Sequence, residues 1–391
     1  MGSYDRLATP LRKTQTTSGP AAAPPQLCRF ARSALRVAFC ALRFARCALR
    51  FRPFPSARHL NSIGRLSGSI LAVGLALGLL PALAAPRSPF SPASPQAASI
   101  ADLFWFTLIA AGLIFLGVEG TILYSAFAHR ERPGREASQF HGNTRVEIIW
   151  TALPALLLLV VFYLTVRTMH DISAPPGDPV EINVVGHQWW WEFSYPKEDV
   201  TTANELHVPV GEPILLHVTS ADVIHSFWVP QLAGKQDANP GHVNDITFTV
   251  SAPGTYLGQC AEFCGIEHTW MAIRVVAEPP AQYAAWVKAQ QQPASRPTSN
   301  LAILGETIFQ SQTCGSCHAI AGTSANGVAG PSLTHVGSRA TIGAGVLDNT
   351  PANMERWLLN PQDVKPGVLM PNSKLTPNDA KALAAYMESL R

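Results

Sequence analysis

Two long apolar stretches stand out in the hydropathy pattern of the first half of the chain. Residues 103–128 carry a single charged side chain, Glu119, and residues 148–168 carry only Arg167 near their end. A helix needs about 20 apolar residues to cross a bilayer, and each stretch is long enough. The pattern therefore predicts a hairpin of two transmembrane helices within residues 86–170.

The segment between the two stretches is basic. It contains Arg130, Arg132, Arg135 and Arg145, whereas the outer flanks hold few basic residues. Short loops rich in Lys and Arg stay in the cytoplasm. We therefore expect this loop on the cytoplasmic side and both ends of the mature chain outside.

The first 85 residues are read as a leader that includes a signal peptide. Residues 1–65 carry twelve Lys and Arg side chains and one acid, and the apolar run 70–80 precedes a small-residue site at Ala82-Leu83-Ala84. A short apolar run followed by a small-residue site is typical of secretory signal peptides. For residues 1–65 an organelle-targeting segment, a long amino-terminal region of the signal and an upstream start codon all stay open.

Strand-like patterns begin after the second apolar stretch. Strand-like runs such as 180–185, 213–218 and 246–250 are punctuated by Gly and Pro, which predicts a β-sandwich over residues 171–288. Residues 289–300 are polar and contain proline, so we read them as a linker. Residues 301–391 end in an amphipathic helical pattern and are expected to form a small all-α domain.

Charge and composition support a membrane protein with an acidic outer part. The chain is 47% hydrophobic and only 14% charged, and its net charge of +3 arises from the basic leader. Residues 171–300 contain five basic and fourteen acidic side chains. A partner that docks there should be basic, and nucleic acid is not an expected partner.

Four of the seven cysteines form two tight pairs, and the other three lie in the leader. The first pair belongs to the stretch Cys260-Ala-Glu-Phe-Cys264-Gly-Ile-Glu-His268-Thr-Trp-Met271. Soft sulfur donors with imidazole suit copper, whereas structural zinc prefers two CxxC or His-pair knuckles. A CxxxC pair alone would also fit a disulfide or buried thiols. His225, 35 residues before Cys260, is the candidate for a further donor.

The second pair forms a CxxCH motif, Cys314-Gly-Ser-Cys317-His318, which is the attachment signature of c-type haem. A thioredoxin-like redox pair would need a βαβ pattern around it, and no such pattern is present. Together with Gly330-Pro331 and Met370-Pro371, the segment resembles a small single-haem cytochrome c. This resemblance implies His318 and Met370 as the iron ligands. Met354 and Met387 are rivals for Met370, but both lie in helical patterns.

From about residue 100 onward the chain resembles subunit II of caa-type cytochrome c oxidases, which carry a fused cytochrome c. The resemblance implies a cupredoxin-like Greek-key domain with a binuclear copper A centre. Its two copper ions would be bridged by the two thiolates, with the remaining ligands from His225, His268, Met271 and the carbonyl of Glu262. It further implies a magnesium or manganese ion near the Glu262 side chain, electron entry at Trp189 and a proton-channel mouth at Glu147. Since three successive indoles cannot share one core from a strand, at least one of Trp189 to Trp191 should face outward.

The function implied by the resemblance is electron entry into a terminal oxidase of the bacterial inner membrane, with the copper and haem domains in the periplasm. Electrons would pass from a basic cytochrome c or another donor through haem c and copper A to subunit I, where oxygen is reduced with proton translocation. Nitrous oxide reductases share the copper ligands but carry a histidine-rich propeller, and quinol oxidases lack the copper cysteines. A freestanding membrane-tethered electron carrier is the remaining alternative.

Overall fold

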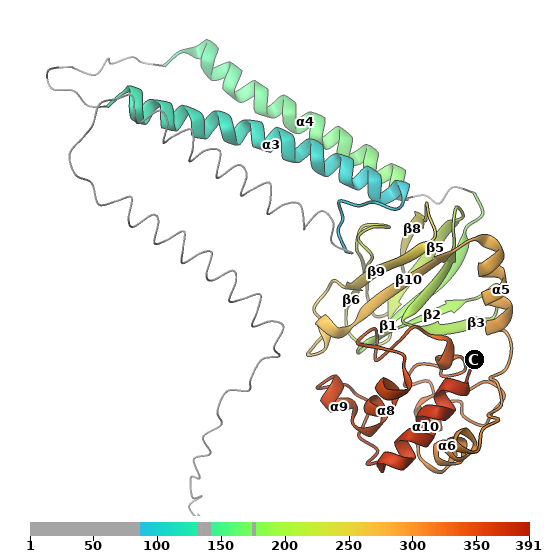
Figure 1. Ribbon diagram of the computed structural model, residues 1–391. Coiled ribbons are helices and arrows are strands. Elements are labelled where there is room, and N and C mark those ends of the chain that lie inside the picture. Colours follow the sequence, from blue (N-terminus) through green and yellow to red (C-terminus); the bar gives the residue numbers. More distant parts are fainter. Residues whose placement is uncertain (1–86, 131–133, 135–141, 174–176) are drawn as a thin grey trace, which may run out of the picture. The chain divides into compact units, whose positions relative to one another are not determined.

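The computed structural model describes residues 87–130, 134, 142–173 and 177–391, and the described residues belong to one compact unit. Two long helices come first, α3 (Pro95–Ala128) and α4 (Thr144–Ser173), and they lie side by side (Figure 1). Both are long and apolar enough to cross a membrane. The leader and signal peptide predicted over residues 1–85 lie outside the described residues.

Helix α3 begins before the apolar run that predicted it. Ser94 caps it, with its Oγ accepting from the backbone N–H of Ala97 at 2.9 Å, and Pro95 occupies the first turn. The side chain of Gln96 then accepts from the N–H of Thr249 at 3.1 Å. The helix starts eight residues before Leu103. Its first two turns pack on the β-domain, so they do not need the continuous apolar sequence of a membrane-crossing segment, and the hydropathy pattern did not reveal them.

The β-domain is a sandwich of two five-stranded sheets with the cupredoxin-like architecture. The first sheet has the order β3-β2-β1-β5-β8, with β1 (Val180–His187), β2 (Trp190–Tyr195), β3 (Val200–Ala203), β5 (Pro213–Ser220) and β8 (Asn244–Thr249). The second has the order β4-β10-β9-β6-β7, with β4 (Glu205–Pro209), β6 (His225–Trp228), β7 (Gln236–Ala238), β9 (Gly254–Cys260) and β10 (Ala272–Glu278). Burial alternates along β5 and β10, so one face of each sheet forms the common core.

Helix α5 (Pro280–Gln290) follows the last strand and packs on the β-domain through Trp286, whose ring stacks on His207 at 4.3 Å. The helix extends two residues into the polar segment 289–300 because the N–H of Gln291 still bonds to the carbonyl of Val287 at 3.0 Å. Irregular chain then leads to Ser299, which caps the next helix.

The carboxyl-terminal domain is helical. It contains α6 (Asn300–Ser311), α7 (Cys314–Cys317), α8 (Pro351–Leu359), α9 (Pro361–Val364) and α10 (Pro377–Ser389), with a two-stranded sheet of β11 (Thr341–Ile342) and β12 (Leu347–Asp348). Helices α6 and α10 cross at Gly305, where a Cβ atom would lie 2.1 Å from the carbonyl oxygen of Ala382. Only glycine permits this approach, which holds the two terminal helices together.

Candidate metal centre and haem pocket

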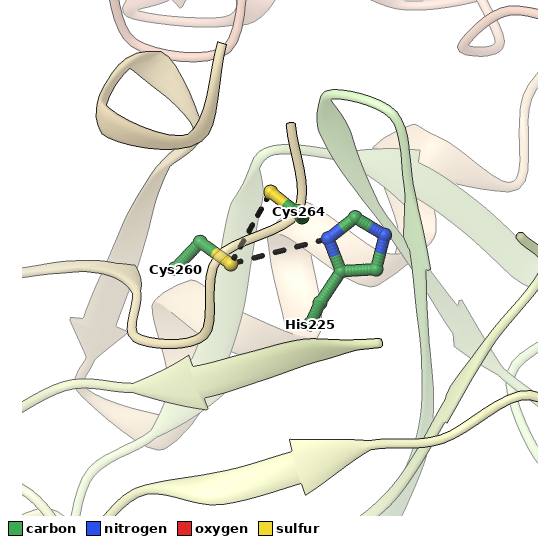
Figure 2. Close-up of side chains that lie close together, drawn as sticks. All are labelled: His225, Cys260 and Cys264. Carbon is green, nitrogen blue, oxygen red and sulfur yellow. Dashed lines mark hydrogen bonds between the residues drawn. The ribbon is translucent and has the colours of Figure 1, made fainter. Parts of the chain in front are cut away.

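Three buried side chains from two neighbouring strands meet at one end of the second sheet. His225 opens β6, Cys260 closes β9, and Cys264 lies in the loop that follows. Strand pairing sets Phe227 opposite Cys260, which brings the two strand ends together. The possible ligand atoms of the three residues lie within 4.8 Å of one another (Figure 2).

The two thiols form the middle of a wider donor set. Their sulfur atoms lie 3.8 Å apart and are not bonded to each other. Nδ1 of His225 lies 3.9 Å from the sulfur of Cys260, and Nδ1 of His268 lies 3.6 Å from that of Cys264. The thioether of Met271 lies 4.0 Å from Cys264. The carbonyl oxygen of Glu262 lies 3.2 Å from the sulfur of Cys260, so the structure brings all six predicted ligands together.

A glycine makes room for this arrangement. A Cβ atom on Gly186 would lie 2.7 Å from the His225 ring, so strand β1 passes that ring only because residue 186 lacks a side chain. In the ligand loop, Gly265 adopts a positive φ of 120° and a Cβ there would meet the Trp189 ring at 2.9 Å. The loop between Cys264 and His268, the two predicted ligands, therefore closes tightly on Trp189.

Asp222 orients His225, and the sequence analysis missed it. Its carboxylate accepts from Nε2 of His225 at 2.8 Å and from the backbone N–H groups of Gln188 and Val223, each at 2.6 Å. Burial alone would raise the pKa of Asp222, but these hydrogen bonds lower it below its usual value. With Nε2 held by a carboxylate, Nδ1 is the nitrogen that faces sulfur. A carboxylate three residues before a candidate ligand histidine is the signal that could have revealed this role.

The donor set suits copper. Two thiolates, two imidazoles and a thioether are soft or borderline ligands, whereas structural zinc takes four ligands in a closed tetrahedron. Hydrogen bonding between the two thiols lowers the pKa of Cys260 far below its usual value, and His225 lowers it further. One of the two sulfurs is thus ready to bind metal as a thiolate. The Glu262 carboxylate points elsewhere and lies 3.7 Å from the ammonium group of Lys235.

The CxxCH motif lines a cavity of about 350 Å³ in the helical domain. Cys314 and Cys317 lie on the single turn of α7, and His318 follows directly. Nδ1 of His318 bonds to the carbonyl of Pro331 at 2.8 Å, which leaves Nε2 as the ligand nitrogen. Met370 also lines the cavity, as do Met354 and Met387 from α8 and α10. Thiols, imidazole, thioether and a mainly apolar wall are the groups that a covalent haem requires.

Trp189, Trp190 and Trp191 are all buried, with 7%, 8% and 0% of their surfaces exposed. The expectation that at least one of them faces outward is therefore wrong. Trp189 and Trp191 both belong to the core of the sandwich, whereas Trp190 packs in a separate cluster with Ala203 and Ala344. Trp189 and Trp190 also line the cavity beside the CxxCH motif, so residues that strand periodicity would leave exposed are covered by the cytochrome domain.

Glu147 lies in the first turn of α4, and its side chain is exposed. The carboxylate reaches back to accept from the N–H of Asn143 at 3.2 Å, as an acid at a helix start commonly does.

Three family models match successive parts of the chain. They are the transmembrane domain of cytochrome c oxidase subunit II over residues 90–166, its periplasmic domain over residues 197–278, and cytochrome c over residues 302–391. A solved structure of the periplasmic domain of subunit II of cytochrome oxidase from Bradyrhizobium japonicum is 32% identical, with a TM-score of 0.30, and covers 30% of this chain and 97% of that one.

Curated relatives extend over most of the chain. Cytochrome c oxidase subunit 2 of Alkalihalophilus pseudofirmus is 36% identical over 309 residues, which is 77% of this chain and 90% of the relative. The protein of the same name from Bacillus sp. strain PS3 is 36% identical over 67% of this chain and 80% of its own. A quinol oxidase subunit 2 of Bacillus cereus is 34% identical over 54% of this chain and 75% of its own. The chain therefore belongs to the cytochrome c oxidase subunit II family and carries a cytochrome c domain fused at its carboxyl end.

Proposed function

We propose that this chain is the electron-entry subunit of a haem-copper terminal oxidase. In the proposed route an electron passes from an external donor to haem c, then to copper A, and then to subunit I, where oxygen is reduced to water with coupled proton translocation. One observation carries the proposal: the ring of Trp189 lines the cavity beside the CxxCH motif, and its N–H bonds to the carbonyl of Cys264 in the copper loop. Trp189 therefore contacts both the candidate haem pocket and the candidate copper loop.

In this proposal the copper site holds two ions. Cys260, Cys264, His225, His268, Met271 and the Glu262 carbonyl would hold them, with His225 and His268 offering Nδ1 toward the sulfurs. A copper pair that shares one unpaired electron across two thiolates changes geometry little on reduction, which makes transfer fast. The buried sulfurs and the Asp222 carboxylate hold this geometry in place before metal arrives.

The cytochrome domain would hold one covalent haem. Cys314 and Cys317 would form the thioether bonds, and His318 and Met370 would supply the iron ligands. Such a haem supplies a second one-electron carrier, whose potential is raised by a thioether ligand. Met370 lies in an irregular segment on the cavity wall, whereas Met354 and Met387 are buried in helices that pack the domain core.

The apolar surfaces of α3 and α4 fit a partner within the membrane. Most of their side chains are exposed in this single chain, and membership of the family implies association with subunit I and other oxidase subunits. The basic loop between the helices supports the proposal that the copper and haem domains lie in the periplasm of a bacterial cell. We further propose that Glu147 lies at the mouth of a proton channel. A magnesium or manganese ion would replace Lys235 as the partner of the Glu262 carboxylate.

Copper and haem analysis of the membrane-purified chain tests the proposal. We expect two copper ions and one covalent haem per chain, and co-purification with a many-helix, haem-containing subunit. A chain that purifies alone with both cofactors would be a freestanding electron carrier instead. Absence of the copper pair or of a c-type band in the reduced spectrum would refute the proposed route.

A further inference from the structure

Two buried charged side chains cross between the β-sandwich and the cytochrome domain, in opposite directions. Glu205, at the start of β4 in the sandwich, is 3% exposed. Its carboxylate accepts three hydrogen bonds from the cytochrome domain: from the N–H of Ala340 at 3.0 Å, and from the N–H and Oγ1 of Thr341 at 2.9 and 3.0 Å. Three donors on one carboxylate form a strong and directional contact.

Lys365 makes the reverse contact. It follows α9 in the cytochrome domain and is 1% exposed. Its ammonium group donates to the carbonyl oxygens of Trp189 and Trp270 in the sandwich, both at 2.9 Å. These partners are neutral, and within the described part of the chain no carboxylate forms an ion pair with the ammonium group. Burial lowers the pKa of Lys365 to about 8, although the charge of Glu267 opposes this shift. A buried lysine is rare because desolvation is costly, which makes a merely incidental contact a poor explanation.

The surface between these two contacts is closely packed. The N–H of Ala272 bonds to the carbonyl of Ala344 at 3.2 Å, and Trp190, Ala203 and Ala344 form a buried apolar cluster. A Cβ atom on Gly345 would lie 2.8 Å from the Cβ of Ala272. Small side chains and direct backbone bonding allow one relative placement of the two domains and few others.

Both contacts of Lys365 lie next to the proposed electron path. Trp270 precedes the ligand Met271, and Trp189 bonds to the carbonyl of the ligand Cys264. Lys365 itself lines the haem cavity. A displacement of this side chain would therefore change the separation between the haem cavity and the copper loop.

We propose that Lys365 and Glu205 are positioning residues that hold the cytochrome domain on the β-sandwich, with Trp189 between the two redox centres. This inference rests on the proposed function. It assigns to two side chains, neither of which binds metal or haem, the separation on which electron transfer within the chain depends. Because tunnelling falls steeply with distance, a loosened contact slows transfer even when both centres are fully loaded.

The test uses the purified oxidase with Lys365→Met, Glu205→Gln and the double variant. The matched controls are Lys374→Met and Glu212→Gln, which change exposed side chains of the same two domains. After rapid reduction of haem c by light, the rate of copper reduction is followed optically. We expect each single variant to slow this step at least tenfold and both controls to keep the wild-type rate. Wild-type rates in both single variants would overturn the inference.

Hydrogen exchange supplies a readout that does not depend on electron transfer. In Glu205→Gln the amides of Ala340 and Thr341 should exchange at least tenfold faster than in wild type and in Glu212→Gln, at equal haem and copper content. Unchanged protection of these amides would count against the inference. If Glu205→Gln loses cofactors, Thr341→Val replaces it, because this variant removes one of the three hydrogen bonds to Glu205. The amide of Thr341 should then exchange faster than in wild type, by a smaller factor. No increase in exchange would overturn the positioning role of Glu205.

The proposed function and this inference fail in different ways. If the wild-type haem never reduces the copper, the proposed function is wrong. If wild-type transfer is fast and the variants transfer equally fast, only the positioning role is wrong.

Discussion

The indole nitrogen of Trp189 donates a hydrogen bond to the carbonyl oxygen of Cys264 at 3.0 Å. The same carbonyl accepts from the side chain of Gln188 at 2.8 Å. The wall of the haem cavity is therefore bonded directly to the backbone of a predicted copper ligand. This relationship makes Trp189 the first residue to test.

Trp189→Phe keeps an aromatic ring but removes the N–H donor. We expect a several-fold slower haem-to-copper transfer. The free energy of unfolding of the sandwich should fall by at least about 1 kcal/mol, because the hydrogen bond is lost and the smaller ring leaves a cavity at this buried position, although Gln188 still satisfies the carbonyl. Flash reduction and chemical denaturation measure the two effects. Trp286→Phe, on the helix that packs on the other end of the sandwich, is the control and should leave transfer unchanged. Equal rates in both variants would remove Trp189 from the path.

Asp222→Asn tests the orientation of His225. The amide cannot accept from the imidazole and both backbone N–H groups at once, so the ring loses its fixed direction. Loss of such a hydrogen bond lowers metal affinity by about 10-fold to 100-fold. Copper titration followed by visible absorption measures it. Asp245→Asn is the control: it removes the carboxylate partner of the surface residue His217 and should leave the copper affinity unchanged. Equal copper affinities in wild type and Asp222→Asn would contradict the proposed orienting role of Asp222.

Met370→Ala tests the assignment of the sixth haem ligand. The variant should keep the covalent haem, because Cys314 and Cys317 are untouched, but its reduction potential should fall and its spectrum should change. Met387→Leu is the matched variant, since that side chain packs in the domain core. It should lower stability without changing the spectrum. The reverse result would assign Met387 to the iron.

The burial of Lys365 predicts a rise in stability with pH. Its pKa is lowered to about 8 when the domains are docked, because burial disfavours the charged form, while Glu267 opposes this shift. Below pH 8 the Lys365 side chain is charged in both the docked and the unfolded state, so the docked state carries the full free-energy cost of burying that charge. Between about pH 8 and the usual lysine pKa of about 10.4, only the docked state has lost the proton, so that cost declines as the pH rises.

The comparison of wild type with Lys365→Met isolates this effect. The difference in unfolding free energy of the cytochrome domain should shift in favour of wild type above pH 8, with a slope approaching about 1.4 kcal/mol per pH unit. Denaturation followed by haem absorption at pH 7, 8 and 9 measures it. A difference that does not vary with pH would show that Lys365 is not buried as a cation.

The local motifs were predictable from sequence, and the contacts between domains were not. The copper loop and the CxxCH motif each place their donors within a few residues, so spacing alone reveals them. The place of His225 beside the thiols could not be predicted from spacing alone, because it depends on the pairing of its strand with the strand that ends at Cys260. Asp222 was missed because its three-residue spacing from His225 suggests a contact but does not show that the carboxylate reaches the ring.

The burial of Trp189, Glu205 and Lys365 depends on where the cytochrome domain lies on the sandwich. No periodicity within either domain encodes that placement. An acid and a lysine in separate domains read as ordinary surface charges, and the strand of three indoles reads as having one exposed face. The early start of α3 was hidden for the same reason, because its first turns contact the sandwich.

The cytochrome domain covers Trp189, and this has a kinetic consequence. A soluble carrier must find its target by collision, at a rate that depends on abundance and on ionic strength. A donor tethered and seated on its acceptor reacts as a first-order process, with an effective concentration that dilution does not change. On the proposed route, refilling of the appended haem, and not encounter at the copper, would be the step through which the supply of reductant sets the rate of electron entry.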